Sequence, residues 1–157
     1  MPNPVTEVER HYMSDELGAR ILAALDGAGF DMGNLTPQDL APMDQLHSGG
    51  WALTEELAGT LDLGPRVHVL DIGCGIGGPA RTLAHTFGCR VTGLELVESF
   101  CRAATMLTAW TGLDERVDFR HGSALGMPFP DAGWETFGIA PHPPSVEPAI
   151  ADHGRGL

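Results

Sequence analysis

Residues 70–80 read LDIGCGIGGPA, an apolar run that leads into four glycines within six residues. The residues just before it, 66–70, are largely apolar and predict a strand. Pro79 favours the first turn of a helix, which we expect to reach Phe87 and to end at Gly88. A strand, a glycine-rich turn and a helix in this order predict a turn whose backbone lies close to a ligand.

Strands and helices continue to alternate after this turn. The pattern predicts a strand over residues 89–94, a helix over 98–110 that closes at Gly112, and a shorter strand over 116–120. Such alternation is typical of an α/β fold with a parallel sheet and right-handed crossovers. We therefore expect residues 63–133 to form a half-domain around this sheet.

Helices are expected before the sheet. Ser14 can cap a helix over residues 15–28, a cap-and-proline pair at 36–37 starts a second, and a third is expected over 51–61. Residues 1–62 are therefore predicted to be an N-terminal helical extension that forms a cap or a substrate lid.

The glycine turn suits two kinds of ligand, because Gly73, Gly75 and Gly78 match the pattern G-x-G-x-x-G. In a dinucleotide site such as that for NAD, a pyrophosphate lies at the helix N-terminus, and the Asp71 carboxylate would repel it. S-adenosylmethionine (SAM) has no phosphate, and it carries a sulfonium, an α-ammonium and a carboxylate. Asp71 can accept a hydrogen bond from that ammonium. The residues therefore favour SAM over NAD.

Two further positions could complete a nucleoside site. Glu95 ends the second predicted strand, where a carboxylate can accept from both ribose hydroxyls. Ser123 and the backbone of Ala124 follow the third strand, near the expected adenine edge. Each position also has a plain structural interpretation: Asp71 as a turn former, Glu95 as a solvated strand-end acid, and Ser123 as a loop residue.

Composition excludes several classes of protein. The formal net charge is −12, from 21 acidic and 9 basic residues, and such a surface repels nucleic-acid phosphates. No run of 18 apolar residues predicts a membrane span, and the polar start MPNPVTEVER predicts no signal peptide. The three cysteines and seven histidines lack metal-ligand spacing. We expect a cytoplasmic protein with buried, reduced thiols and no metal.

Four segments together resemble a known family. VLDIGCGIGGPARTLA, VTGLEL, GSALGMPFPDAG and the upstream DQLHSGGWALTEELA are similar to successive motifs of class I SAM-dependent methyltransferases. The similarity is to the small-molecule type, such as phosphoethanolamine, sarcosine and dimethylglycine N-methyltransferases and quinone and tocopherol methyltransferases. It covers about residues 8–133. It is strongly specific for the cofactor and weakly specific for the substrate, and it implies a Rossmann-like sheet.

The resemblance implies that four residues contact the methionine part of SAM: Asp71, Gly73, Cys74 and Gly75. It implies that Glu95 holds the ribose and that Leu96 packs beside the adenine. Ser123 and Ala124 would reach the adenine edge, although the family commonly has an aspartate at position 123, which is a stronger acceptor.

Three upstream residues also match family positions. Leu46 and His47 lie where phosphoethanolamine-type enzymes close over SAM. Tyr12 matches a tyrosine near the reacting methyl group, which makes it the candidate catalytic residue. Plain alternatives are an anchor packed on the core for Tyr12 and a surface residue for His47.

The pattern changes at Trp134, where the chain continues WETFGIAPHPPSVEPAIADHGRGL. We expect residues 134–157 to lie outside the family pattern, with WETFGI forming at most one short strand. A sheet truncated after its third strand would leave the first strand paired on one side only, and this open edge could recruit a partner chain or a second copy. Our hypothesis for the change is a shifted reading frame beyond codon 134.

The residues and the resemblance together predict a SAM-dependent methyltransferase. Its acceptor would be a nitrogen, oxygen or carbon atom of a small molecule, and its activity would be impaired in this short chain. One alternative is a SAM-binding module or inactive remnant that needs a partner chain. Another is an NAD-dependent oxidoreductase, which Asp71 disfavours.

Overall fold

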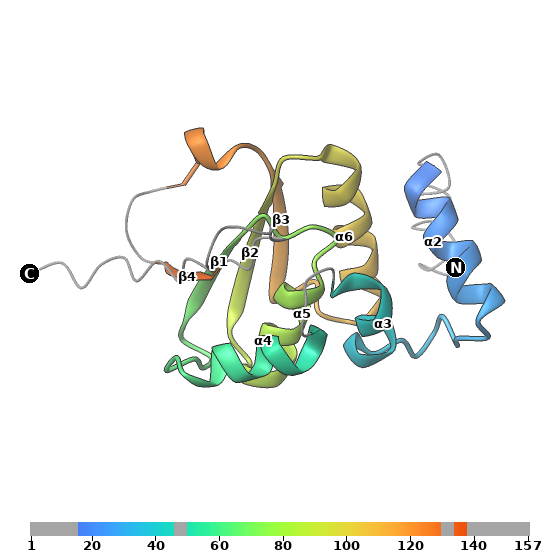
Figure 1. Ribbon diagram of the computed structural model, residues 1–157, viewed down its shortest axis with the longest axis horizontal. Helices are drawn as coiled ribbons and strands as arrows, with labels where there is room; N and C mark the ends of the chain where they lie inside the picture. Colours follow the sequence, from blue (N-terminus) through green and yellow to red (C-terminus); the bar gives the residue numbers. More distant parts are fainter. Residues whose placement is uncertain (1–15, 46–49, 130–133, 138–157) are drawn as a thin grey trace, which may run out of the picture.

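The computed structural model describes residues 16–45, 50–129 and 134–137, which form a parallel sheet with helices before and between its strands (Figure 1). The strands are β1 (His68–Ile72), β2 (Arg90–Glu95), β3 (Val117–His121) and β4 (Glu135–Phe137). They lie in the order β3-β2-β1-β4, and every pair is parallel. This is the arrangement of the first half of a Rossmann-like sheet, so the predicted fold class is confirmed.

Two helices of the sheet region follow the predictions closely. Helix α5 (Gly78–Phe87) starts one residue earlier than expected, and Gly88 ends it in the left-handed conformation. Helix α6 (Glu98–Trp110) has the predicted bounds. Helix α4 (Gly50–Gly59) precedes β1.

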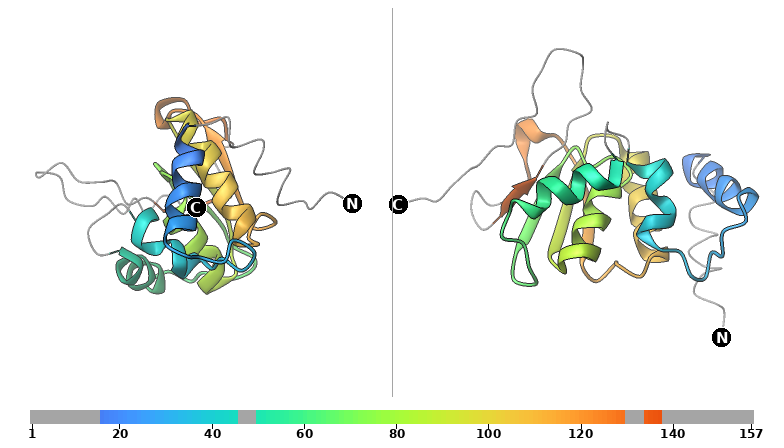
Figure 2. Two further views of the ribbon diagram at one scale, coloured as in Figure 1. Left: turned by 90° about the vertical axis from the view of Figure 1, so that its right-hand side faces the viewer. Right: turned by 60° about the horizontal axis from the view of Figure 1, so that its bottom comes forward.

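One apolar core lies between the sheet and these helices. Val69, Val91 and Val117 are in register across β1, β2 and β3, so their side chains point to the same face. They pack against buried residues of α4 and α5: Ala58, Ala80, Leu83 and Ala84. Helices α4 and α5 therefore cover one face of the sheet, as the right-hand view of Figure 2 shows.

A second core joins the N-terminal helices to α6. Helix α2 (Glu16–Gly27) packs along α6, through Ile21 and Leu25 against residues such as Met106 and Leu107 (Figure 1). Helix α3 (Pro37–Asp44) begins at Pro37 with Thr36 as its N-cap, as predicted.

The start of α3 is a reciprocal capping box. The Thr36 hydroxyl accepts from the Asp39 backbone N–H, and the Asp39 carboxylate accepts from the Thr36 backbone N–H.

The opposite face of the sheet carries a series of polar contacts between side chains of β1, β2 and β3. Thr92 donates its hydroxyl hydrogen to Asp118 at 2.6 Å, so His68 Nε2, 2.9 Å from the same hydroxyl, must be the donor to Thr92. Arg120 forms an ion pair with Asp118 at 3.3 Å, and both side chains are exposed. The ring of Trp134 lies over the His68 ring, with centroids 4.1 Å apart.

Two predictions about the strands need correction. Strand β1 spans 68–72 instead of 66–70, so Asp71 lies within the strand and not after it. Strand β1 is also paired on both sides, because Val69, Leu70 and Asp71 are in register with the three residues of β4. The expectation of one-sided pairing was wrong, whereas the short strand in WETFGI is confirmed. In the part of the chain that is described, no helix is both long and apolar enough to cross a membrane.

Candidate cofactor site at the carboxyl ends of the strands

The turn after β1 is built by glycines in a conformation that other residues rarely adopt. Gly73, Gly75 and Gly77 have φ values of 73°, 56° and 85°. The backbone N–H groups of Gly73 and Cys74 both donate to the Leu94 carbonyl oxygen, at 2.8 and 3.2 Å. The turn is therefore held against the end of β2, where Glu95 follows.

Asp71 is the most unusual group at this edge. The residue is only 2% exposed, and its Oδ2 atom has no hydrogen-bond partner. Burial, with a smaller contribution from the negative charge of Glu95, raises the pKa of Asp71 to about 7. A buried carboxylate oxygen without a partner is costly, and it would be stabilised by a cationic donor.

Glu95 joins the glycine turn to the loop after β2. Its Oε2 accepts from the Gly75 N–H and its Oε1 from the Val97 N–H, both at 2.9 Å. A carboxylate has about four acceptor positions, so each oxygen keeps capacity for one further donor such as a ribose hydroxyl. Glu95 is therefore held in place by backbone bonds, and it is not a solvated strand-end acid, since the residue is 9% exposed.

Cys74 packs closely against Gly93 of β2, next to Asp71. A Cβ atom on Gly93 would lie 2.6 Å from the Cys74 Sγ and 2.6 Å from the Phe119 ring, so only glycine fits there. Gly93 is the register partner of Asp71. The three cysteines, including Cys74, are buried and free, as expected from the sequence.

The loops after β2 and β3 are joined by a histidine. His121 Nε2 lies 2.9 Å from the Leu96 carbonyl oxygen, to which it can only donate. Leu96 itself is 67% exposed. Ser123 caps the short 3₁₀ helix η1 (Ala124–Gly126) by accepting from the Leu125 N–H at 3.2 Å. The Ser123 hydroxyl thus has a local structural role, and Ala124 is exposed beside it.

The structure therefore brings together one group of the predicted site residues: Asp71, Gly73, Cys74, Gly75 and Glu95. Leu96, Ser123 and Ala124 lie on the neighbouring loops at the same edge of the sheet. Tyr12, Leu46 and His47 fall outside the described residues.

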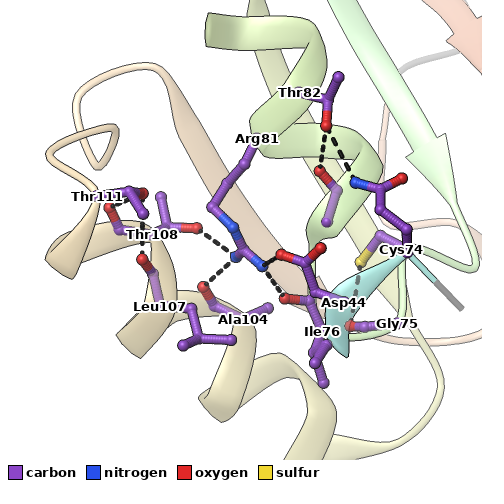
Figure 3. A network of polar contacts seen from close by, with 12 residues as sticks. Asp44, Cys74, Gly75, Ile76, Arg81, Thr82, Ala104, Leu107, Thr108 and Thr111 are labelled. Carbon is purple, nitrogen blue, oxygen red and sulfur yellow. Dashed lines mark hydrogen bonds and ion pairs between the residues drawn. The ribbon is translucent and has the colours of Figure 1, made fainter. Parts of the chain in front are cut away.

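A buried polar network that was not predicted from the sequence lies next to the turn (Figure 3). Arg81 of α5 and Asp44 of α3 form an ion pair at 2.8 Å, with side chains 0% and 1% exposed. Arg81 Nη2 also donates to the Ile76 carbonyl oxygen within the turn, at 2.8 Å. The one available sequence signal was a charged residue among the apolar residues of PARTLA, on a helix that proves to be buried.

The electrostatics of this edge favour a particular kind of ligand. Asp71 and Glu95 place two carboxylates beside the turn, which disfavours a pyrophosphate at the N-terminus of α5. A ligand with a cationic amine and neighbouring hydroxyls would satisfy the unpartnered oxygen of Asp71 and the remaining acceptor positions of Glu95.

Comparisons with known proteins point to one family. A family model described as "Methyltransferase domain" matches residues 69–141. A sterol 24-C-methyltransferase of Gibberella zeae is 35% identical over 104 residues, which are 64% of this chain and 27% of that protein. A glycine/sarcosine/dimethylglycine N-methyltransferase of Actinopolyspora halophila is 32% identical over 60% of this chain and 17% of its own length.

A solved structure is similar to this chain in both fold and sequence. Geranyl diphosphate methyltransferase in complex with SAM superposes with a TM-score of 0.53 and 28% identity, covering 56% of this chain and 36% of that one. The chain thus spans 27% and 17% of the length of the two curated relatives just described and 36% of this structure. The family match begins in β1 and extends through β4 to residue 141.

Proposed function

Because this chain belongs to the class I SAM-dependent methyltransferases, we propose that it binds SAM at the carboxyl ends of β1 and β2 and serves methyl transfer to a small-molecule acceptor. The family uses SAM, and the residues at this edge fit it. The observation that carries the proposal is the buried Asp71 carboxylate, whose Oδ2 has no partner. The α-ammonium of SAM is a cationic donor of the kind that this oxygen requires.

The residues of the site then have separate binding roles. Asp71 accepts from the ammonium, and the glycine turn allows the backbone to lie close to the methionine part. Glu95, already fixed by the Gly75 and Val97 N–H groups, accepts from the ribose hydroxyls. Leu96, which is exposed in this structure, offers an apolar surface for the adenine, and Ser123 and Ala124 lie beyond it on the next loop.

SAM supplies an electrophilic methyl group on a positively charged sulfur. The protein contributes alignment of that group with an attacking nitrogen, oxygen or carbon atom, together with exclusion of water. Asp71 and Glu95 bind and orient, and neither is assigned as a general base. Tyr12 is proposed to lie near the reacting methyl group, and Leu46 and His47 are proposed to close over SAM, because the three residues match those positions of the family that the sequence resembles.

The small-molecule acceptor is proposed from the relatives. Their names describe methylation of a sterol, of glycine and its N-methyl derivatives, and of geranyl diphosphate. These acceptors differ in chemistry, so they support the acceptor class and not one compound.

The first test is calorimetric titration of the 157-residue chain with SAM. We expect binding by the native chain and at least a tenfold weaker Kd for Asp71→Ala, because the ammonium loses its buried partner. Asp114→Ala, which alters an exposed carboxylate far along the chain, is the matched control and should bind like the native chain. NAD should give no binding heat. No SAM binding by a folded native chain would refute the proposal.

A second outcome distinguishes the alternative of a SAM-binding module. The chain covers only a minor part of its relatives' length, so cofactor binding and turnover can be separated. SAM binding without methyl transfer to any of a panel of amines, sterols and quinols would favour a module that requires further residues or a partner chain.

A further inference from the structure

Arg81 is held at the meeting point of four segments of the chain (Figure 3). Its Nη2 donates to Asp44 Oδ2 on α3 and to the Ile76 carbonyl in the glycine turn, both at 2.8 Å. Its Nη1 donates to the Ala104 carbonyl and the Thr108 hydroxyl of α6, at 3.2 and 3.0 Å. All four Nη hydrogens are therefore used, and the guanidinium is fixed in one orientation.

The guanidinium also packs directly on the turn. A Cβ atom on Gly77 would lie 2.9 Å from Arg81 Nη1, so the turn passes the guanidinium only because Gly77 has no side chain. A Cβ atom on Gly78 would collide with the Asp44 carbonyl oxygen. The C-terminal end of α3 thus rests on the N-terminal end of α5, beside the turn.

A second contact strengthens the same junction. Gln45, directly after Asp44, donates from Nε2 to the Thr82 hydroxyl at 3.1 Å, and its Oε1 accepts from Thr54 of α4 at 3.2 Å. The end of α3 is therefore tied to α5 by adjacent residues, one charged and one neutral.

A buried ion pair between two helices carries a large desolvation cost. Desolvation of both charges offsets much of their attraction, and well-packed apolar pairs are often as stable. Asp44 Oδ1 and Arg81 Nε remain buried without partners, which adds to the cost. The gain specific to this pair is the bond from Arg81 to Ile76, which an apolar side chain could not make.

We propose that Arg81 is a positioning residue for the glycine turn, and that Asp44 couples the shape of the turn to the N-terminal helices α2 and α3. The inference rests on the proposed SAM site. Arg81 holds the Ile76 carbonyl and so sets the turn in which Gly73, Cys74 and Gly75 meet the cofactor. Cofactor binding in turn stabilises the end of α3 through the Arg81–Asp44 pair.

The test separates positioning from simple support of the fold. Arg81→Met and Asp44→Leu each leave one buried charge without its partner, and we expect both single variants to unfold at lower temperature. The double variant Arg81→Met/Asp44→Leu removes both charges, so its Tm should return close to the native value. Its Kd for SAM should stay at least tenfold weaker, because the Ile76 carbonyl has lost its donor.

Thr108→Val is the matched control. It removes another hydrogen bond of Arg81 while leaving the Ile76 and Asp44 contacts in place, so Tm should fall slightly and the Kd for SAM should not change. A double variant with native Tm and native Kd would overturn the proposal, because Arg81 would then only support the fold.

A measurement on the native chain covers the case in which the double variant does not fold. Amide hydrogen exchange with and without SAM should show added protection in two places, the turn at 73–78 and the end of α3 at 40–45. Protection of the turn with no change at 40–45 would refute the coupling to α3. No SAM binding at all would instead refute the proposed function, which keeps the two failures distinct.

Discussion

Asp71 shows how one side chain can bring fold stability and ligand binding into conflict. Its carboxylate is buried on β1, its Oδ2 has no partner, and Glu95 adds a second negative charge nearby. In the free protein these conditions favour the protonated acid. A cationic ligand favours the ionised form, so occupation of the site and protonation of Asp71 oppose each other.

The pKa of Asp71 gives a pH dependence with a definite sign. The folded-state pKa of about 7 lies above the ordinary value of 3.8, so the folded chain holds the proton more tightly than the unfolded chain. The free energy of unfolding should therefore fall as pH rises from about 4 to about 7. At 1.36 kcal/mol per pKa unit, the contribution of Asp71 to this fall is about 4 kcal/mol.

Chemical denaturation of the free chain between pH 4 and 8 measures this effect. Asp71→Asn should remove most of the pH dependence and should be more stable than the native chain at pH 8, whereas Asp114→Asn should keep it. SAM binding near pH 7 should release up to about half a proton per site, because Asp71 is about half protonated at that pH, and calorimetry in buffers of different ionisation enthalpy detects the release. An Asp71→Asn variant with an unchanged pH profile would show that another group titrates.

At the scale of elements, the junction of α3 and α5 leaves no room for a side chain at Gly78. Gly78 begins α5, and the backbone of Asp44 ends α3 directly against it. The contact partner is backbone and cannot rotate away. A single added methyl group must therefore push two helices apart.

Gly78→Ala should lower the free energy of unfolding by about 1–3 kcal/mol, the usual cost of overpacking. Gly59→Ala is the matched control, because a Cβ atom there meets nothing within 4 Å and alanine favours a helix over glycine. Denaturant unfolding of both variants measures the difference. Equal stability of the two variants would mean that α3 moves freely away from α5.

Some elements could be predicted from the sequence because their signals are local. The cap at Thr36, the full range of α6 and the glycine turn all depend on residues within a few positions of each other. The bounds of β1 were shifted, because Asp71 was interpreted as a residue after the strand. Its burial depends on β2 and β4, which are far away in the sequence.

Some residues of the candidate site could also be predicted from the sequence, and others could not. Asp71, the glycines and Glu95 follow the ends of predicted strands, so their proximity was predictable. The pair of Asp44 and Arg81 was not, because 37 residues separate them and neither has a local pattern that indicates a partner. The cap that the Ser123 hydroxyl provides to η1 was not predicted from the sequence, and its contact with the adenine edge stays a prediction.

At the scale of the whole molecule, the sheet has two edges and both are protected. The edge strand β4 has three residues in register with β1, and the edge strand β3 carries exposed charges at Asp118 and Arg120. Short strands and charged side chains are common means of preventing edge pairing. The formal net charge of −12 adds repulsion between copies.

We therefore expect the chain to be a monomer at micromolar concentration, as light scattering after size exclusion would measure. Because β4 pairs with β1, an assembly through an open sheet edge would have to use the outer side of β4 or of β3. A stable dimer that dissociates on Arg120→Glu would contradict this and would place the interface on β3.

The position of β4 also has a consequence for synthesis of the chain on the ribosome. Strand β1 gains β2 as a neighbour soon after it is made, but its other neighbour ends at Phe137, 65 residues after Ile72. At roughly 5–20 residues per second, that interval lasts about 3–13 s. For those seconds, the backbone N–H and C=O groups on one side of β1 have no partner strand, beside the apolar Val69 and Leu70. During that interval the nascent chain can mispair at the strand that carries Asp71.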